Sequence, residues 1–149
     1  MLKKVGLGFL LLLVAVYAAA ALVPLDPEEQ RPGTRLSGDH VYTPVSDWSF
    51  VQPGQKVWVQ TNTWYGIPHS VTTVSFVVND KLYIPCGWCA TKRWPKNVAA
   101  DPEVVVKIAD KLYPLTAEKV NDQAFIEQIF SRMDIPADGV AVYRMNPRS

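Results

Sequence analysis

The chain has 149 residues, which is the length of one domain, and a formal net charge of +1. Because it has neither a basic surplus nor an acidic tail, the composition argues against nucleic acid and against a partner chosen by charge alone. Aromatic residues make up 11% of the chain, with five Trp and six Tyr, which suits a β-rich core or a pocket that stacks flat ligands.

The first 23 residues indicate a membrane anchor or a secretory signal. Lys3 and Lys4 precede the run Val5–Val23, which carries no charge and has Tyr17 as its only polar side chain. These 19 residues, at about 1.5 Å each, would just cross a hydrocarbon core of about 30 Å, and the lysines favour a cytoplasmic N-terminus. The small residues Ala18–Ala21 leave open that the segment is a cleaved signal peptide. Both interpretations place the domain on the non-cytoplasmic side, periplasmic or extracellular.

The rest of the chain divides into a linker and one β-rich domain. Residues 24–40 are rich in Pro, Gly and charge, which predicts a linker, and the domain is expected to span residues 41–149. Alternation or enrichment in Val, Thr and Phe predicts six strands in it. They are Lys56–Thr61, Ser70–Val78, Lys81–Pro85, Val104–Ile108, Lys111–Leu115 and Val140–Met145. The turn pairs Asn79-Asp80 and Ala109-Asp110 predict two tight hairpins.

Two short helices are predicted between these strands. The first covers Pro95–Ala100 and stops before Asp101-Pro102. The second is capped by Asn121 and runs to about Met133, with one apolar face that packs on the sheet. Because hairpins dominate the order of elements, we expect an α+β domain whose mainly antiparallel sheet is closed or half closed into a barrel.

The most conspicuous motif is Cys86-Gly87-Trp88-Cys89. Outside the cytoplasm such a pair is usually oxidised, which favours a structural disulfide between Cys86 and Cys89. A redox-active pair is a second interpretation, although the residues after the motif leave little helix on which Cys86 could sit. Zinc is the weakest, because it needs about four ligands and His40 and His69 are the only histidines. We therefore predict no metal site.

Lys92-Arg93-Trp94 follows a strand end and precedes a predicted helix. Two cations and an indole at such a place could hold a phosphate and a flat ring. The alternative is a solvated basic loop in which Trp94 closes the end of the barrel. His69 opens a strand, and a lone histidine is more often structural than catalytic. Ser70 beside it lacks the pattern of a nucleophile elbow, which makes a hydrolase triad a weak hypothesis.

Three features between Thr61 and Ala117 form a recognisable pattern. Thr61–Val71 combines a strand, a Gly-containing turn and a run of Val and Thr, and Leu82–Ile84 adds a short strand. Lys92–Val98 contains a Trp-x-x-Asn helix, and Asp101–Val104 reads DP-x-V. The stretch resembles the split β-barrel flavin-binding proteins, which include the pyridoxamine-phosphate-oxidase-like proteins and the deazaflavin-dependent nitroreductases.

The resemblance implies a split β-barrel with two short helices that binds FMN or a related flavin or deazaflavin as an oxidoreductase. It implies that Lys92 and Arg93 meet the cofactor phosphate and that Trp94 and Asn97 shape its pocket. It also places Trp64, Tyr65, His69 and Ser70 beside the cofactor. Trp64 and Tyr65 stand where the deazaflavin enzymes usually have a basic Gly-rich turn. Split barrels commonly pair, so a homodimer is expected.

Three hypotheses for function follow. The first is a membrane-tethered enzyme that reduces a small or membrane-borne acceptor through a flavin-type cofactor. The second is a module that binds a small-molecule ligand or a partner without redox work. The third is a thiol–disulfide protein that uses Cys86 and Cys89.

Overall fold

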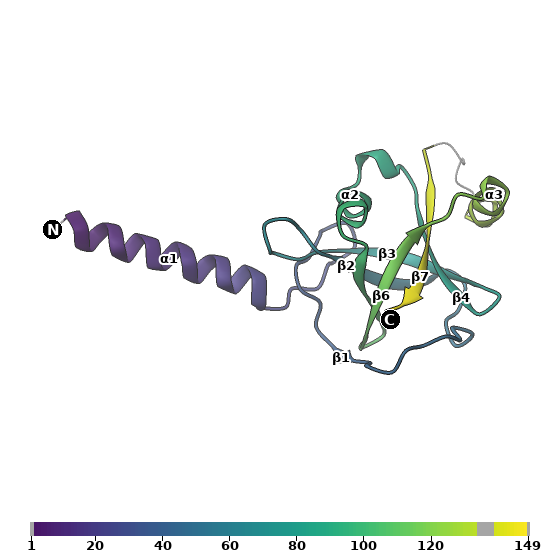
Figure 1. The fold of residues 1–149 in the computed structure, drawn as a ribbon, viewed down its shortest axis with the longest axis horizontal. Helices are drawn as coiled ribbons and strands as arrows, with labels where there is room; N and C mark the ends of the chain where they lie inside the picture. Colours follow the sequence, from purple (N-terminus) through teal and green to yellow (C-terminus); the bar gives the residue numbers. More distant parts are fainter. Residues whose placement is uncertain (1, 134–138, 149) are drawn as a thin grey trace.

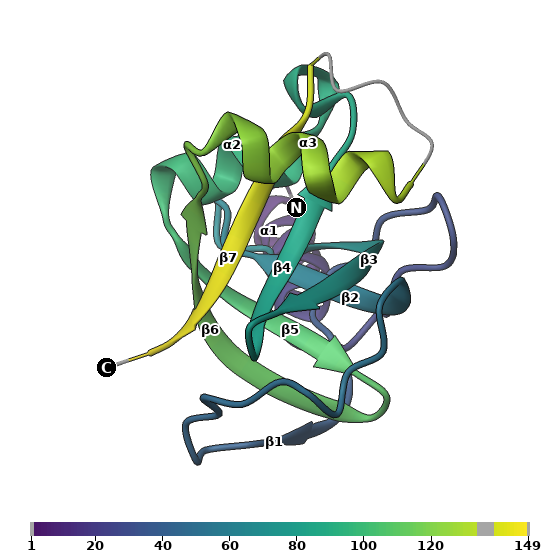
Figure 2. The same cartoon turned by 90° about the vertical axis from the view of Figure 1, so that its right-hand side faces the viewer.

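The computed structural model describes residues 2–133 and 139–148, which form one long helix and a closed barrel. The barrel strands follow the order β6-β5-β2-β3-β4-β7, every pairing between them is antiparallel, and β7 pairs back to β6 (Figures 1 and 2). A short strand, β1, adds to β6 in parallel. The strands are β1 (Asp39–His40), β2 (Gln55–Thr61), β3 (His69–Val78), β4 (Lys81–Cys86), β5 (Glu103–Ile108), β6 (Lys111–Lys119) and β7 (Ala141–Pro147).

The barrel follows from the alternation in its strands. In β2, the side chains of Val57 and Val59 are fully buried, whereas Lys56 before them is exposed and Trp58 between them is only partly buried, as expected for a strand with one face in the core. All six predicted strands are confirmed, most with ends shifted by one or two residues. Strand β6 is longer than predicted, because beyond its hairpin with β5 it pairs with β7, placing Ala117 opposite Met145.

Both predicted hairpin turns are present. Asn79 and Asp80 have φ angles of 48° and 59°, the left-handed pair that matches a two-residue turn to the twist of its strands. Ala109 also lies in the left-handed region, at φ 52°, in the turn between β5 and β6. The turn residues were therefore a reliable local signal.

Two α-helices and a 3-10 turn accompany the strands. They are η1 (Cys89–Thr91), α2 (Arg93–Ala100) and α3 (Gln123–Ser131), and both figures show α2 and α3 on the side of the barrel opposite β1. The prediction that Asn121 caps the last helix is wrong. Asp122 is the cap, since its side chain accepts a hydrogen bond from the Phe125 amide at 3.1 Å. The helix buries Ile129 and Phe130 in an apolar cluster against the sheet.

The N-terminal helix α1 (Leu2–Leu22) projects away from the barrel as a rod and meets the rest of the chain near its C-terminal end (Figure 1). Its large apolar side chains from Leu7 to Tyr17 are exposed, and those of Leu7, Phe9 and Leu13 are each at least half exposed. Within the part of the chain that the structure describes, no helix combines the length and the hydropathy that crossing a bilayer requires.

Residues 24–40, the predicted linker, make contacts with the barrel. The amide and carbonyl of Gly33 exchange hydrogen bonds with those of Ser70 at 2.9 and 3.0 Å. Leu36 is buried, and Asp26 forms an ion pair of 2.6 Å with Lys107 of β5. The Pro- and Gly-rich composition here reflects an extended strap along the barrel rather than a spacer, because the strap carries its own apolar and charged anchors.

Candidate functional site

A groove of about 460 Å³ runs between the first half of β3, the end of β4 and the start of α2. It is lined by His69 from β3, Cys86 and Trp88 from the CxxC segment, and Lys92, Arg93 and Trp94 at the start of α2. Its volume lies within the usual range for small-molecule sites, about 300–1,000 Å³. The structure therefore brings four of the eight predicted cofactor-binding residues into one depression: His69, Lys92, Arg93 and Trp94.

The cationic wall of the groove is formed where α2 begins. Lys92 is the N-cap residue of this helix, and no side chain caps the helix amides there. Both Lys92 and Arg93 are exposed. Amides at a helix N-terminus together with two cations form an arrangement that attracts a phosphate. Arg93 is partly held, since its Nη1 donates to the Tyr65 hydroxyl at 3.4 Å.

His69 lies half-buried beside these cations. Burial lowers the pKa of its imidazole, and the positive charge of Arg93 lowers it further. The side chain is thus an uncharged imidazole at neutral pH, able to donate one hydrogen bond and to accept another. The groove therefore places the positive charges of Lys92 and Arg93 beside the neutral imidazole of His69.

We expect Arg93→Ala to raise the pKa of His69 toward its ordinary value of 6.5, while leaving it below that value because burial remains. The titration can be followed from the imidazole ring protons by NMR, because His40 is the only other histidine and a His40→Gln variant assigns the signals. A His69 pKa that is unaltered in Arg93→Ala would contradict this electrostatic contact.

Trp94 and Asn97 serve the structure more than the surface of the groove. Trp94 is only 3% exposed and packs on Tyr143 of β7, with ring centroids 4.9 Å apart. Asn97 donates from Nδ2 to the Thr61 hydroxyl at 2.9 Å and so fixes α2 to the end of β2. Of the two alternatives for Lys92-Arg93-Trp94, the structure combines both: the indole closes the barrel and the cations line the groove.

The three remaining predicted residues lie outside the groove lining. Trp64 is 96% exposed, and its ring meets that of Tyr65 edge-on at 5.4 Å. Tyr65 reaches the site only through Arg93. Ser70 is fully buried against the strap at Gly33, and among the residues that the structure describes its hydroxyl has no hydrogen-bond partner. Ser70 faces the strap because its neighbour His69 takes the groove side of the alternating strand.

Trp88 is the groove residue that sequence reasoning missed as a ligand contact. It stands between the two cysteines, is 64% exposed, and adopts a left-handed backbone with φ 49°. An exposed indole at the rim of a groove can stack on a flat ring. The available signal was its position in the motif, between two cysteines that are predicted to be bonded to each other.

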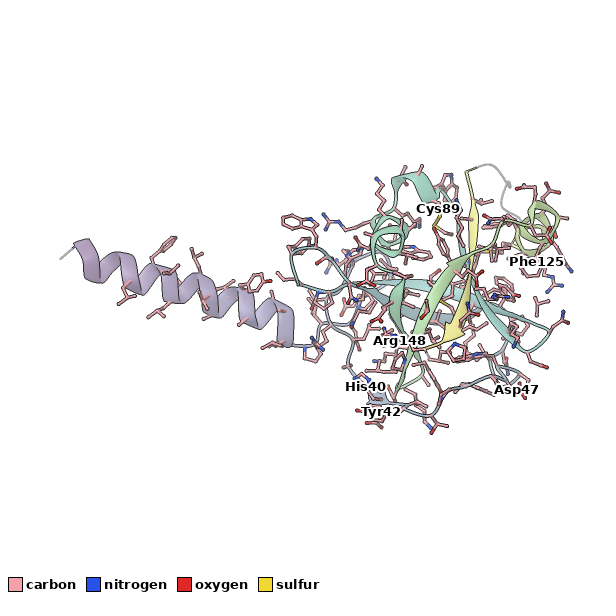
Figure 3. The ribbon with its side chains drawn as sticks, viewed as in Figure 1. His40, Tyr42, Asp47, Cys89, Phe125 and Arg148 are labelled. Carbon is pink, nitrogen blue, oxygen red and sulfur yellow. A yellow bond between two sulfur atoms is a disulfide. The ribbon has the colours of Figure 1, made fainter. Side chains whose placement is uncertain are left out.

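Cys86 and Cys89 are joined by a disulfide, as predicted (the sulfur is yellow in Figure 3). Cys86 is 2% exposed and Cys89 is partly buried, so the bond lies in the wall of the groove with little of it open to solvent. This burial favours the structural interpretation of the motif over the redox one. Among the described residues, no group of three or more His, Cys, Asp and Glu side chains could hold a metal.

We expect the variant Cys86→Ala/Cys89→Ala to lose about 2 kcal/mol in free energy of unfolding, the loop-closure effect for so short a loop. Chemical denaturation of the oxidised wild type and the variant measures the difference. Thiol labelling of the wild type under denaturing, non-reducing conditions should find no free thiol. Equal stabilities, or ready labelling of both cysteines, would contradict a structural role.

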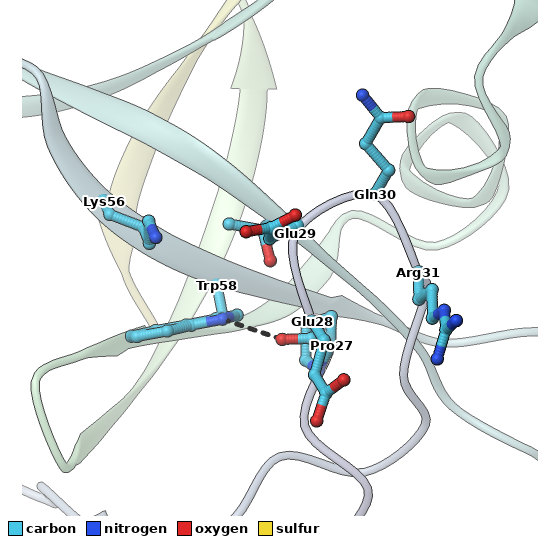
Figure 4. Close-up of a pocket in the computed structure, with 8 residues that line it drawn as sticks. Pro27, Glu28, Glu29, Gln30, Arg31, Lys56 and Trp58 are labelled. Carbon is cyan, nitrogen blue, oxygen red and sulfur yellow. Dashed lines mark hydrogen bonds between the residues drawn. The ribbon is translucent and has the colours of Figure 1, made fainter.

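A larger cavity of about 710 Å³ lies between the strap and the outer face of β2 (Figure 4). Trp58 forms one wall and donates from Nε1 to the Pro27 carbonyl at 3.2 Å. Its rim mixes Glu28 and Glu29 with Lys56 and Arg31. Because its two carboxylates offset its two cations, this cavity offers less to an anionic ligand than the groove does.

Comparisons with known proteins support the fold. No protein-family profile matches the sequence, and no curated protein matches it. Among solved structures, a candidate pyridoxamine 5'-phosphate oxidase from Listeria innocua aligns with a TM-score of 0.55 and 18% identity, covering 64% of this chain and 85% of that one. General stress protein 26 from Bacillus anthracis aligns with a TM-score of 0.52 and 16% identity, over 65% of this chain and 82% of its own. The domain is a split β-barrel.

A third match fits the same description. A conserved hypothetical protein from Mycobacterium tuberculosis aligns with the split barrel at a TM-score of 0.51 and 16% identity, covering 64% of this chain and 74% of that one. At these identities the likeness establishes the fold.

The groove residues fit a phosphate-bearing aromatic cofactor. Lys92, Arg93 and the first amides of α2 match a phosphate, the exposed ring of Trp88 matches a flat ring system, and the volume suffices. His69 adds a neutral hydrogen-bonding group at the Arg93 side. This donor set suits an anionic ligand with a flat ring better than a metal or a purely apolar ligand.

Proposed function

We propose that the split barrel binds a flavin-type cofactor, FMN or a related flavin or deazaflavin, in the groove and acts as an oxidoreductase on a small or membrane-borne acceptor. The observation that carries the proposal is the placement of two exposed cations at the start of α2, in the same groove as an exposed indole. Each is common alone, but together they suit the two ends of one nucleotide-like ligand.

The protein's own residues would bind and orient this cofactor. Lys92 and Arg93 would hold the phosphate through charge-assisted hydrogen bonds, and Trp88 would cover one face of the ring system. His69 would act as a neutral hydrogen-bond partner rather than as a third cation. Once bound, the flavin ring system would supply the electron transfer itself.

The direct experiment is an absorption spectrum of the full chain purified gently from membranes, followed by titration with FMN. We expect a flavin spectrum, or saturable FMN binding if the cofactor is lost in purification. Binding without reduction of any acceptor would favour the alternative of a ligand-binding module. No spectrum and no binding would overturn the proposal.

We also propose that α1 tethers the domain to a membrane with the barrel on the non-cytoplasmic side. The support is the exposed apolar surface of α1, together with Lys3 and Lys4 before the apolar run. Protease added to spheroplasts should digest the domain, whereas protection until lysis would contradict this topology.

Two contacts favour retention of α1 over cleavage as a signal peptide. The Tyr17 hydroxyl donates to the Tyr65 carbonyl, and Arg35 Nε donates to the Ala21 carbonyl at 3.1 Å. Cleavage within the alanine run would remove Tyr17 and with it the contact to the Tyr65 carbonyl. The intact mass of the mature protein tests whether α1 is retained. We further propose that the protein forms a homodimer, which analytical ultracentrifugation of the full chain tests.

A further inference from the structure

The loop between β2 and β3, residues 62–68, carries an aromatic pair that the groove does not use. Trp64 is 96% exposed, and Tyr65 beside it is partly buried. A fully exposed indole has an apolar body with one polar N–H, and such side chains gather at the interface between a membrane and water. The exposed ring of Trp64 is therefore suited to contact the interfacial layer of a membrane.

The loop is held beside the C-terminal end of α1. The Tyr17 hydroxyl donates to the Tyr65 carbonyl, and a Cβ added to Gly66, at φ +79°, would lie 2.7 Å from the same hydroxyl oxygen. Gly66 is thus the residue that allows this close approach. Tyr17 stands five residues before the end of α1 at Leu22, about 8 Å along the helix axis.

This placement sets the level of the loop relative to a bilayer. If α1 is the membrane tether, the loop lies alongside its last turn and a half rather than beyond it. The strongly apolar part of α1 ends at Val16, and the alanines that follow Tyr17 suit the less apolar interfacial layer. A span that is short for the bilayer is accommodated by local thinning and by lysines that extend to the headgroups. Trp64 then falls at headgroup depth.

Positive charges surround the same place. Arg93 donates to the Tyr65 hydroxyl at 3.4 Å, and Lys92 precedes it at the start of α2. Arg35 holds the last turn of α1 through Ala21. Cations grouped around interfacial aromatics are attracted to anionic phospholipid headgroups. The charge of this surface therefore complements the same partner that the aromatic residues suit.

We propose that Trp64, Tyr65 and Arg93, together with the C-terminal end of α1, form a docking surface for the headgroup layer of an anionic phospholipid bilayer. The proposal rests on the tethering proposed for α1. Because Arg93 also lines the groove, that end of the groove lies at headgroup level. The acceptor that enters there is an amphipathic molecule dissolved in the membrane, which narrows the acceptor class of the proposed oxidoreductase.

The test is fluorescence quenching on the full chain in vesicles of phosphatidylcholine and phosphatidylglycerol. Three single variants, Trp64→Cys, Tyr42→Cys and Leu13→Cys, each carry an environment-sensitive fluorophore, and a nitroxide on the lipid headgroup or chain is the quencher. The native cysteines are disulfide-bonded and do not react. All three side chains are at least half exposed, so the fold is preserved, which circular dichroism checks. Tyr42 is the matched aromatic control, 86% exposed near β1 (Figure 3).

We expect the fluorophore at position 64 to show blue-shifted emission and strong quenching by the headgroup nitroxide, with neither effect at position 42. Quenching at position 13 by the chain nitroxide, without any effect at position 64, would overturn the docking surface while leaving the tether intact. Absence of quenching at position 13 would overturn the tether and the docking surface together.

Discussion

Asp26→Ala is expected to lower the free energy of unfolding by about 3 kcal/mol, because it leaves the ammonium of Lys107 in a buried place without its counter-charge. Lys107 is 6% exposed, its Nζ lies 2.6 Å from Asp26 Oδ2, and it sits 5.5 Å from the ring centre of Trp58. After the substitution, the Ser37 hydroxyl at 3.2 Å is the remaining polar contact that the structure gives this ammonium. Urea denaturation of wild type and variant measures the loss.

The matched control is the double variant Asp26→Ala/Lys107→Met. It removes both charges and keeps an unbranched apolar chain over Trp58, so it should be more stable than Asp26→Ala alone. A single variant as stable as wild type would show that the strap is not held by this pair. A double variant less stable than the single one would contradict the account of an unpaired buried charge.

The same pair gives a dependence on pH. Burial alone would raise the pKa of Asp26, but hydrogen bonds from Lys107 and Ser37 outweigh it, so the pKa ends below its ordinary value of 3.8. The unfolded chain then binds a proton at a higher pH than the folded one. The stabilisation is therefore complete above about pH 4 and is lost as the pH falls from 3.8 through the lowered pKa. The double variant should lack this acid-sensitive step.

Arg93→Ala is expected to weaken FMN binding roughly ten- to a hundredfold. A charge-assisted contact is worth about 1.5–3 kcal/mol, and each 1.4 kcal/mol corresponds to a factor of ten. Arg93 is exposed and adds little to the core, so the melting temperature without ligand should stay the same. Isothermal titration calorimetry with FMN on both proteins gives the ratio of affinities.

Lys96→Ala is the matched control for Arg93→Ala. Lys96 is an exposed cation on the same helix, one turn further on, and it does not line the groove. It should leave the affinity for FMN within about twofold of wild type, because its exposed charge does not line the groove and makes no direct contact with a phosphate bound there. Equal losses in Arg93→Ala and Lys96→Ala would indicate attraction by net charge and no defined phosphate site.

The barrel could be predicted from the sequence because its signals are local. Val57 and Val59 alternate with polar neighbours in β2, and Asn79-Asp80 marks a tight turn whichever way the rest of the chain runs. The cap of α3 was misplaced by one residue for the same local reason: Asn121 and Asp122 are both good caps, and only the backbone geometry selects between them.

The strap could not be predicted, because its partners are far away in the sequence. Lys107 appears in an alternating strand as an ordinary outward cation, and its counter-charge, Asp26, lies 81 residues earlier. Likewise, the sequence does not show which of Trp88, in a turn, and Trp94, in a helix, is buried. Trp94 proved to be core, whereas Trp88 proved to be the exposed ring, because burial depends on the closed barrel around each of them.

The central claim is that the groove recognises the phosphate of a flavin nucleotide, and the affinities of FMN and riboflavin for the full chain test it most directly. The two ligands share the same ring system and differ in the phosphate, so their ratio isolates the contribution of Lys92 and Arg93. We predict that wild type binds FMN at least about tenfold more tightly than riboflavin, and that this preference is much reduced in Arg93→Ala. Equal affinities for the two ligands in wild type, or no binding of either, would contradict the claim.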